Sequence, residues 1–344
     1  MVMKSDQSLE ENDPMNWQKA VPYDTRQEAI ADAITAFKGC LTKMKQGLIN
    51  HFDVSFRSKK AQTSQAFKVN KNALNLETME IFPRRLKKSK TLRMRKRDKR
   101  KKLRWFQGQK TPDGNFTIIK TRPNKWYICL PVKVVDPTTN SNNMTNPYKS
   151  VFMDPGVRSF QTLYSPDGIC GKIGGPEFNN QLETLAKKHD RLWSKSDLTN
   201  NQRTRQHLKR RCALIRWKMK NKVTDLHWQT CSFLCSTFDL VFLPRFEVSD
   251  MVQGSPLGSK ITRKMLQLSH GAFRERLLYF ARTKQCKVYL VGEQYSTKTC
   301  GNCGNLQPMN GLKVYNCSQC GQKLDRDYNG ARNICLKVMS QLSY

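Results

Sequence analysis

The spacing of hydrophobic positions changes several times along the chain, and each change predicts a different element. Between Thr25 and about Lys45 apolar residues recur at helical spacing, and Thr25 with Glu28 forms a capping-box pattern, so we expect a helix there. Alternating apolar and polar residues then predict strands in "FDVSFRSKK", "QAFKVNK", "NFTIIKT" and "KWYICLPVKV". The first part of the chain is therefore expected to be a small β-domain with an attached helix.

A second series of elements begins with "YKSVFMDPGVRSFQTLYSPDGICGKIGG", which predicts three strands joined by turns at Pro155-Gly156 and "SPDG". Helical sequence follows from about Asn179 to Phe238, and "FDLVFLPRFEVSD" predicts a buried strand. A helix from about Thr262 to Thr283, the strand "KVYLVG" and a final helix from about Asn329 complete the series. This order of three strands, helix, strand, helix, strand and helix is that of an RNase H-like domain with a mixed sheet.

These patterns divide the chain into six segments of an α/β protein with small β and zinc-ribbon parts. We expect a tail over 1–20, a basic β and helical region over 21–135, a linker over 136–148, an RNase H-like domain over 149–298 and 324–344, and an inserted cysteine module over 299–323.

The charge of the chain points to a polyanionic partner. Its 344 residues include 61 Lys and Arg against 27 Asp and Glu, a formal net charge of +34. Such an excess repels itself unless nucleic acid is the usual partner. No apolar run approaches a membrane span and no secretory leader pattern opens the chain, so we expect no membrane partner and no secretion.

The stretch "KKSKTLRMRKRDKRKKLR", residues 87–104, carries twelve basic residues and one acid, and Trp105 follows it. Basic side chains neutralise phosphates and an aromatic ring stacks on a base, so the run predicts a nucleic-acid contact, with nuclear import as a compatible second role. A solvated loop is the alternative for a basic run in general. The residues predicted to bind are Arg95, Lys96, Arg97, Lys99, Arg100, Lys101 and Trp105.

Four of the twelve cysteines, Cys300, Cys303, Cys317 and Cys320, form a C-x2-C-x13-C-x2-C pattern in which each pair is followed by glycine. Four thiolates at this spacing predict a closed tetrahedral Zn²⁺ site with a structural role. The other cysteines are scattered, and a disulfide framework is disfavoured in an unsecreted chain.

Acids stand near the ends of predicted strands. Asp154 ends the first strand of the second series, Glu247 ends the fourth, and Asp325 and Asp327 precede the last helix. Three carboxylates can hold two Mg²⁺ ions for phosphodiester cleavage. Each acid also has a structural explanation as a turn former, a solvent-facing residue or a helix cap, and Asp250 and Glu293 are rivals of Glu247.

Three stretches resemble a known family. "VFMDPGVRSF", "LVFLPRFEVSDM" and "YSTKTCGNCG…YNCSQCGQKLDRDYNGARNI" are similar to the split RuvC motifs and inserted zinc ribbon of TnpB and Fanzor nucleases, relatives of type V CRISPR effectors. "VPYDTRQEAI" and "FDVSFRSKK" resemble the wedge-like segments that precede the nuclease in the Fanzor branch.

The resemblance implies a transposon-associated, RNA-guided DNA endonuclease with a guide RNA and a double-stranded DNA target. It implies Asp154, Glu247 and Asp327 as the catalytic Mg²⁺ ligands, with Asp325 the rival for the third place. It also implies a nuclear location in a eukaryotic host and a cytosolic one otherwise. Family members usually carry a longer N-terminal region, so the chain is expected to be either a truncated or a compact member.

Two other functions remain open from the sequence. One is a transposition regulator that binds nucleic acid through an inactive RNase H-like domain, and the other is a DNA-strand-transfer transposase. Neither the guide RNA sequence, the target-adjacent motif nor the oligomeric state follows from the sequence.

Overall fold

The computed structural model describes residue 18 and residues 21–55, 65–76, 80–82, 112–121, 125–131, 149–248, 251–252, 258–284, 286–308 and 312–342. The chain divides into two compact units, Met1–Val134 and Val135–Tyr344. The predicted linker and the predicted basic run both lie outside the described residues.

The first unit contains a three-stranded antiparallel sheet in the order β1-β4-β5. A short 3₁₀ helix, η2 (Lys71–Ala73), and a two-stranded sheet accompany it. The strands are β1 (Gln65–Val69), β2 (Leu74–Asn75), β3 (Glu80–Ile81), β4 (Phe116–Lys120) and β5 (Trp126–Cys129). Their alternating inward residues form one small core, made of Val69, Leu74, Leu76, Ile81, Phe116 and Ile118.

Helix α1 (Tyr23–Lys45) packs on β1, and polar contacts fix it there. Asp32 accepts a bond of 2.7 Å from Lys68, and Glu28 accepts one of 2.9 Å from the side chain of Asn115. The capping-box prediction is wrong, because the helix begins at Tyr23 and no side chain caps its first residue. Glu28 is instead used in the contact with Asn115.

One strand prediction in this unit is also wrong. Residues 52–55, the described part of "FDVSFRSKK", are in neither a strand nor a helix. Phe52 instead lays its ring edge-on against Phe37 of α1, with ring centres 5.5 Å apart. The apolar residue Phe52 therefore packs on α1, and the described part of this segment forms no strand.

The second unit is built on a five-stranded sheet in the order β10-β9-β6-β7-β8. The middle strand, β6, runs antiparallel to β7 and parallel to β9, and β9 runs parallel to β10. The three-strand meander predicted from the sequence is confirmed. The strands are β6 (Ser150–Pro155), β7 (Gln161–Tyr164), β8 (Cys170–Ile173), β9 (Leu240–Pro244) and β10 (Lys287–Val291).

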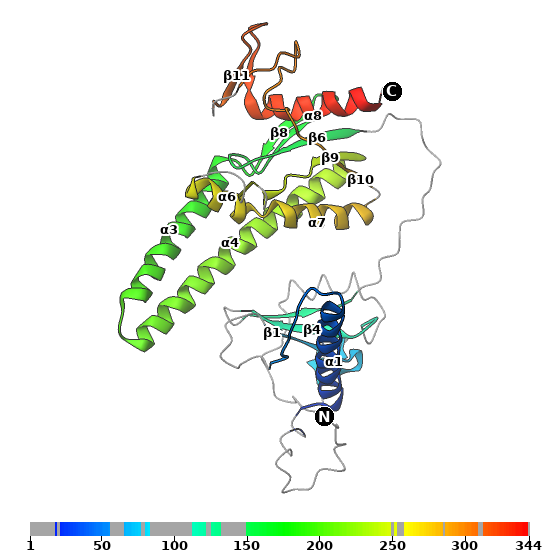
Figure 1. The fold of residues 1–344 in the computed structure, drawn as a ribbon, viewed down its shortest axis with the longest axis vertical. Helices are drawn as coiled ribbons and strands as arrows, with labels where there is room; N and C mark the ends of the chain where they lie inside the picture. Colours follow the sequence, from blue (N-terminus) through cyan, green and yellow to red (C-terminus); the bar gives the residue numbers. More distant parts are fainter. Residues whose placement is uncertain are drawn as a thin grey trace. The chain divides into compact units, whose positions relative to one another are not determined.

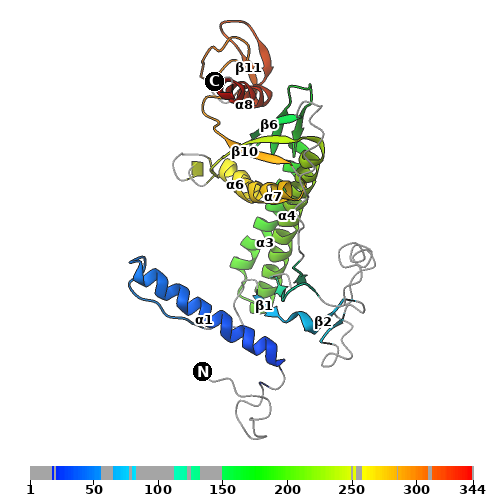
Figure 2. The same cartoon turned by 90° about the vertical axis from the view of Figure 1, so that its right-hand side faces the viewer.

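Side chains of β6 alternate between two covered faces. Val151 and Met153 join the larger core against helices α3, α4 and α7, whereas Phe152 joins a second core with Ile334 of helix α8. Figures 1 and 2 show α8 on one side of the sheet and α7 on the other. A residue two positions after Phe152 therefore lies on the face that α8 covers, and that residue is Asp154.

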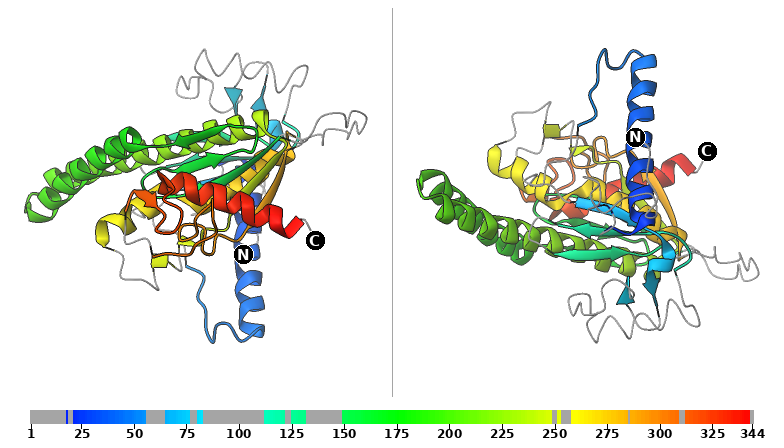
Figure 3. Two further views of the ribbon diagram at one scale, coloured as in Figure 1. Left: turned by 90° about the horizontal axis from the view of Figure 1, so that it is seen from above. Right: turned by 90° about the horizontal axis from the view of Figure 1, so that it is seen from below.

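Helices of this unit lie on both faces of the sheet, and α3 and α4 form a long antiparallel hairpin (Figure 3). The side chain of Asn201 caps α4 by accepting a bond of 3.1 Å from the amide of Thr204. The helix expected from Thr262 to Thr283 is two helices, because Ser269 adopts a left-handed conformation between them. The helices are α3 (Pro176–Leu198), α4 (Gln202–Thr237), α6 (Ser259–Leu268), α7 (His270–Arg282) and α8 (Arg326–Leu342). None of the helices in the described residues combines the length and apolar character that a bilayer crossing requires.

Candidate active site and metal centre

Asp154 lies near the end of the middle strand, on the face that α8 covers. The helix backbone passes directly over its carboxylate, since a Cβ atom added at Gly330 would lie 2.6 Å from Oδ2 of Asp154. Burial, with smaller contributions from the negative charges of Asp327 and Glu293, raises the pKa of Asp154 to about 7. Arg326 and Arg158 act in the opposite direction. The structure thus brings Asp154 together with two other acids.

Asp327 stands in the first turn of α8 and is 16% exposed. Its Oδ1 accepts a bond of 2.6 Å from Arg158, in the loop between β6 and β7. Lys172 of β8 lies 3.6 Å from Oδ2. Two cations of the sheet side therefore hold this carboxylate at the start of the helix.

Asp325 has a different task. Its Oδ1 accepts bonds from the amides of Asp327, at 2.9 Å, and Tyr328, at 3.4 Å, which is the bonding of a helix cap. Burial opposes its ionisation, but the bond from Lys172 and these amides outweigh burial and lower the pKa of Asp325. The cap of α8 is Asp325, which leaves Asp327 as the acid turned toward Asp154.

Glu247 is not brought to this group by any described contact. It lies three residues beyond the end of β9, its side chain is 52% exposed, and its nearest described cation is Arg274 at 3.8 Å. The register that pairs Phe152 with Phe242 places Pro244, rather than an acid, level with Asp154 on β9. Asp250, the other rival, lies outside the described residues.

Glu293 follows β10 by two residues and is partly buried, and burial raises its pKa. Because β6, β9 and β10 are parallel, their C-terminal ends meet at one edge of the sheet. The sequence named Glu293 only as a rival to Glu247, because acids after two neighbouring strands look alike in one dimension. The signal that could have separated the two acids is their distance from the strand end: Glu293 lies two residues beyond β10, and Glu247 lies three residues beyond β9.

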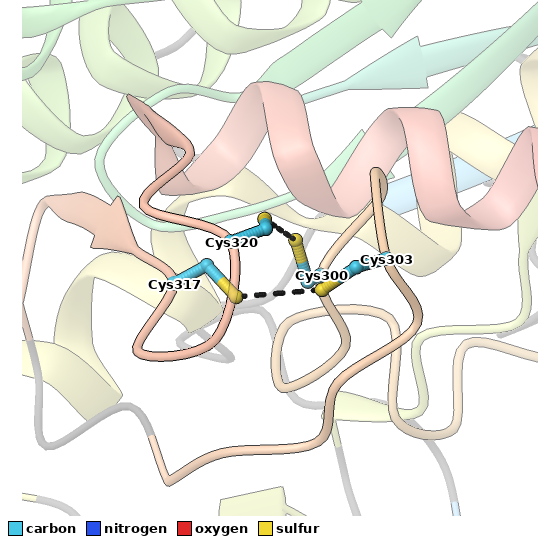
Figure 4. Close-up of side chains that lie close together, drawn as sticks. All are labelled: Cys300, Cys303, Cys317 and Cys320. Atoms are coloured by element: carbon cyan, nitrogen blue, oxygen red, sulfur yellow. Dashed lines mark hydrogen bonds between the residues drawn. The ribbon is translucent and has the colours of Figure 1, made fainter.

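The four predicted cysteines converge, as Figure 4 shows. Their sulfur atoms all lie within 4.8 Å of one another, with 3.7 Å between Cys300 and Cys320 and 3.6 Å between Cys303 and Cys317. Tetrahedral Zn²⁺ with bonds near 2.3 Å requires sulfur separations of about 3.8 Å. The donor set therefore fits a structural zinc ion.

Both cysteine pairs use the same local geometry. Gly304 and Gly321, which follow the pairs, have φ of +77° and +70°, and their amides donate to the carbonyls of Cys300 and Cys317 at 3.0 and 3.1 Å. A left-handed residue at this place turns the chain back toward the four sulfur atoms, which explains the glycine after each pair. The second pair lies between β11 (Val314–Asn316) and β12 (Lys323–Asp325), and the ribbon core is the fully buried ring of Tyr315.

Comparisons with known proteins agree with these motifs. Residues 270–334 match the family described as Cas12f1-like, TNB domain. The TnpB-like protein L770 of Acanthamoeba polyphaga mimivirus is 29% identical over 318 residues, which are 90% of this chain and 56% of the relative. The chain is therefore similar to TnpB-like proteins over most of its own length. It spans just over half the length of that mimivirus relative.

A CRISPR-associated protein and a solved Cas12f1 complex are also similar to parts of this chain. The CRISPR-associated endodeoxyribonuclease Cas12f1 of Sulfoacidibacillus thermotolerans is 27% identical over 98 residues, covering 28% of this chain and 22% of that protein. A Cas12f1–sgRNA–target DNA complex solved by electron cryomicroscopy has a TM-score of 0.39 and 17% identity, over 64% of this chain and 55% of that one.

Proposed function

We propose that this chain is the nuclease region of a transposon-associated, RNA-guided DNA endonuclease that depends on Mg²⁺. The observation that carries the proposal is the position of Asp154. It is partly buried on the middle strand, and burial together with the charges of Asp327 and Glu293 raises its pKa to about 7. Acids whose ionisation is disfavoured by burial and by each other are typical of functional sites.

The sheet supports an RNase H-like assignment. Its middle strand has two neighbours in an antiparallel meander on one side and two parallel strands on the other, with helices on both faces. Asp154 is on that middle strand and Asp327 on the helix that crosses it. This is the arrangement that the element order predicted.

The carboxylates suit hard cations. Oxygen ligands are what Mg²⁺ requires, and a cation would offset both the burial and the neighbouring negative charges that raise the pKa of Asp154. When bound, two Mg²⁺ ions would supply an activated water and neutralise the leaving oxygen. We propose Asp154, Asp327 and Glu293 as the ligands, with Glu293 in the place that the resemblance gave to Glu247.

Residues of the chain itself prepare this site. Strand β6, held between β7 and β9, fixes the position of Asp154. Arg158 and Lys172 contact the carboxylate of Asp327 and hold it in place, and Asp325 caps the first turn of α8. The zinc ribbon is structural in this proposal, since all four positions of the ion are taken by thiolates.

Guide RNA and target DNA are the proposed partners. A net charge of +34 requires a polyanion to balance it, and the predicted basic run offers a dozen cations in 18 residues. The similarity to TnpB-like proteins and to an endodeoxyribonuclease supports DNA as the substrate. Sequencing the RNA that co-purifies with the protein would identify the guide.

Cleavage of plasmid DNA carrying the guide-matched target tests the proposal. Asp154→Asn and Asp327→Asn should each abolish Mg²⁺-dependent cutting and leave co-purified RNA unchanged, because each loses only a metal ligand. Asp325→Asn is the matched control, since asparagine also caps a helix. It should still cut.

If both Asp154→Asn and Asp327→Asn cut DNA at the wild-type rate, the nuclease assignment would be contradicted. A wild-type protein that retains RNA but never cuts a matched target would favour the transposition regulator instead.

A further inference from the structure

Two buried asparagines of α8 lie on the same side of the helix, one turn apart. Asn329 is fully buried and Asn333 is 7% exposed, and their four-residue spacing stacks them on one face. Asp327 stands two residues before the first of them. Buried amides without partners are costly, so the groups that they bond are part of the structure's stability.

Both asparagines bond the backbone of the ribbon around Cys300. Asn329 donates to the carbonyl of Thr299 at 2.8 Å and accepts from the amide of Gly301 at 3.1 Å. Asn333 donates to the same carbonyl of Thr299 at 2.7 Å. These bonds straddle a zinc ligand whose residue is almost fully buried.

Asn333 also reaches the turn that carries Glu293. It donates to the carbonyl of Ser296 at 2.7 Å, and the amide of Ser296 donates to the carbonyl of Glu293 at 3.2 Å. One side chain therefore links the segment after β10 to the helix of Asp327. The two proposed metal ligands are joined through it.

Gly301 of the ribbon packs closely against the two asparagines of α8, and this contact is called the ribbon–helix junction. A Cβ added at Gly301 would lie 2.9 Å from Oδ1 of Asn333 and 3.2 Å from Oδ1 of Asn329. Glycine at this position allows the ribbon backbone to approach the helix closely. The ribbon and α8 consequently meet as one packed unit.

We infer that Asn329 and Asn333 are positioning residues that set the separation of Asp327 from Glu293 through the first zinc knuckle. The inference rests on the proposed function. Arg158 and Lys172 hold Asp327 from the sheet side, and the asparagines hold its helix from the ribbon side. Replacing the asparagines would remove one side of this support without substituting any of the proposed metal ligands.

The test measures Mn²⁺ binding to the zinc-loaded full chain by electron paramagnetic resonance, and target cleavage against Mg²⁺ concentration. Asn333→Ala and Asn329→Ala should retain one zinc per chain. We expect Mn²⁺ binding to be weaker and the Mg²⁺ concentration for half-maximal cutting to be about tenfold higher in both variants. Loss of a group that orients metal ligands commonly has an effect of this size.

Val338→Ala is the matched control, because Val338 is a buried α8 residue that packs on the sheet rather than on the ribbon. It should lower the melting temperature and leave Mn²⁺ affinity unchanged. Gly301→Ala disturbs the same junction from the ribbon side while removing no bond or ligand, and it should shift Mn²⁺ affinity in the same direction. This variant decides the matter if the asparagine variants do not fold.

Wild-type Mn²⁺ affinity in the folded asparagine variants, or in Gly301→Ala where those variants do not fold, would overturn the inference. An equal shift in Val338→Ala would also overturn it, because general loosening of α8 would then suffice. A wild-type protein that neither binds Mn²⁺ nor cuts would instead defeat the proposed function.

Discussion

A carboxyl group on the middle strand of a sheet is placed by its backbone rather than by its own contacts. Asp154 alternates with core residues of β6, so its position follows from the ladder, and its pKa is raised to about 7 by burial and by acids from two distant segments. Such a site is sensitive to single changes of charge.

Glu293→Gln should reduce Mg²⁺-dependent cleavage at least about a hundredfold, because a proposed ligand is lost while the shape of the side chain is retained. Glu247→Gln is the comparison, and it should cut nearly as the wild type does, since Glu247 is half exposed. Cleavage rates at saturating Mg²⁺ measure both. The reverse result would restore Glu247 to the catalytic acids in place of Glu293.

The buried side chain of His227 should make the free energy of unfolding sensitive to acid. It is buried, stacks on Phe160 with ring centres 4.9 Å apart, donates from Nε2 to the carbonyl of Leu268, and accepts at Nδ1 from Arg276 at 2.7 Å. Burial chiefly lowers its pKa to about 4, with the charge of Arg276 in the same direction. A proton at Nδ1 would face the guanidinium directly.

A folded-state pKa below the unfolded value of about 6.5 means that the contribution of His227 is complete above pH 6.5 and is lost as pH falls toward 4. The loss between pH 7 and pH 5 should be about 2 kcal/mol in the free energy of unfolding. Urea unfolding of the wild type and of His227→Gln at both pH values measures it. An equal pH dependence in the two proteins would contradict the assignment.

At the scale of elements, the ribbon consists of two copies of one turn whose four sulfur atoms lie close together. Each turn is local, but its hydrophobic support is small, since Tyr315 is the large buried side chain among the described ribbon residues. Small modules of this kind depend on zinc for their folding.

Cys303→Ser should reduce the zinc content from one ion per chain to none, because three thiolates bind far less tightly than four. The ribbon should then become accessible to protease, with faster cleavage between residues 299 and 323. Elemental analysis and limited proteolysis measure the two effects. Cys170→Ser, at an exposed cysteine of β8, is the control and should keep its zinc.

At the scale of the whole molecule, positive charge is the dominant property, with 61 basic residues against 27 acids. The acids of the proposed site are thus a small negative region in a strongly basic chain. Long-range attraction would bring phosphate toward the protein from any direction, and its strength falls with salt.

Neutralising Arg95, Lys96, Arg97, Lys99, Arg100 and Lys101 together should weaken RNA binding equally across sequences and reduce the salt slope by roughly 0.7 to 0.9 log units per lost contact. Trp105→Ala should add about 1 to 3 kcal/mol if a base stacks on the ring. Affinities over a salt series measure both. Unchanged slope and affinity would leave nuclear import as the role of this segment.

Features that depend on neighbours in the chain could be predicted from the amino-acid sequence. The two knuckles follow from cysteine spacing and from glycines with positive φ, and the strands of the second unit follow from alternating or continuous apolar runs. The hinge at Ser269 had no such mark, because nothing in its composition distinguishes a left-handed serine from a helical one.

Contacts between groups that are distant in the sequence could not be predicted in this way, because they depend on how the strands and helices pack. Asp154 and Glu293 are brought together by the parallel order of β6, β9 and β10, and strand order is not written in the spacing of apolar residues. The partners of two polar side chains were likewise not predictable from the sequence. Glu28 accepts a bond from Asn115 instead of capping α1, and Asn333 links the ribbon to α8. A polar side chain has several partners of similar energy within reach, and packing chooses among them because burial makes an unpaired polar group costly.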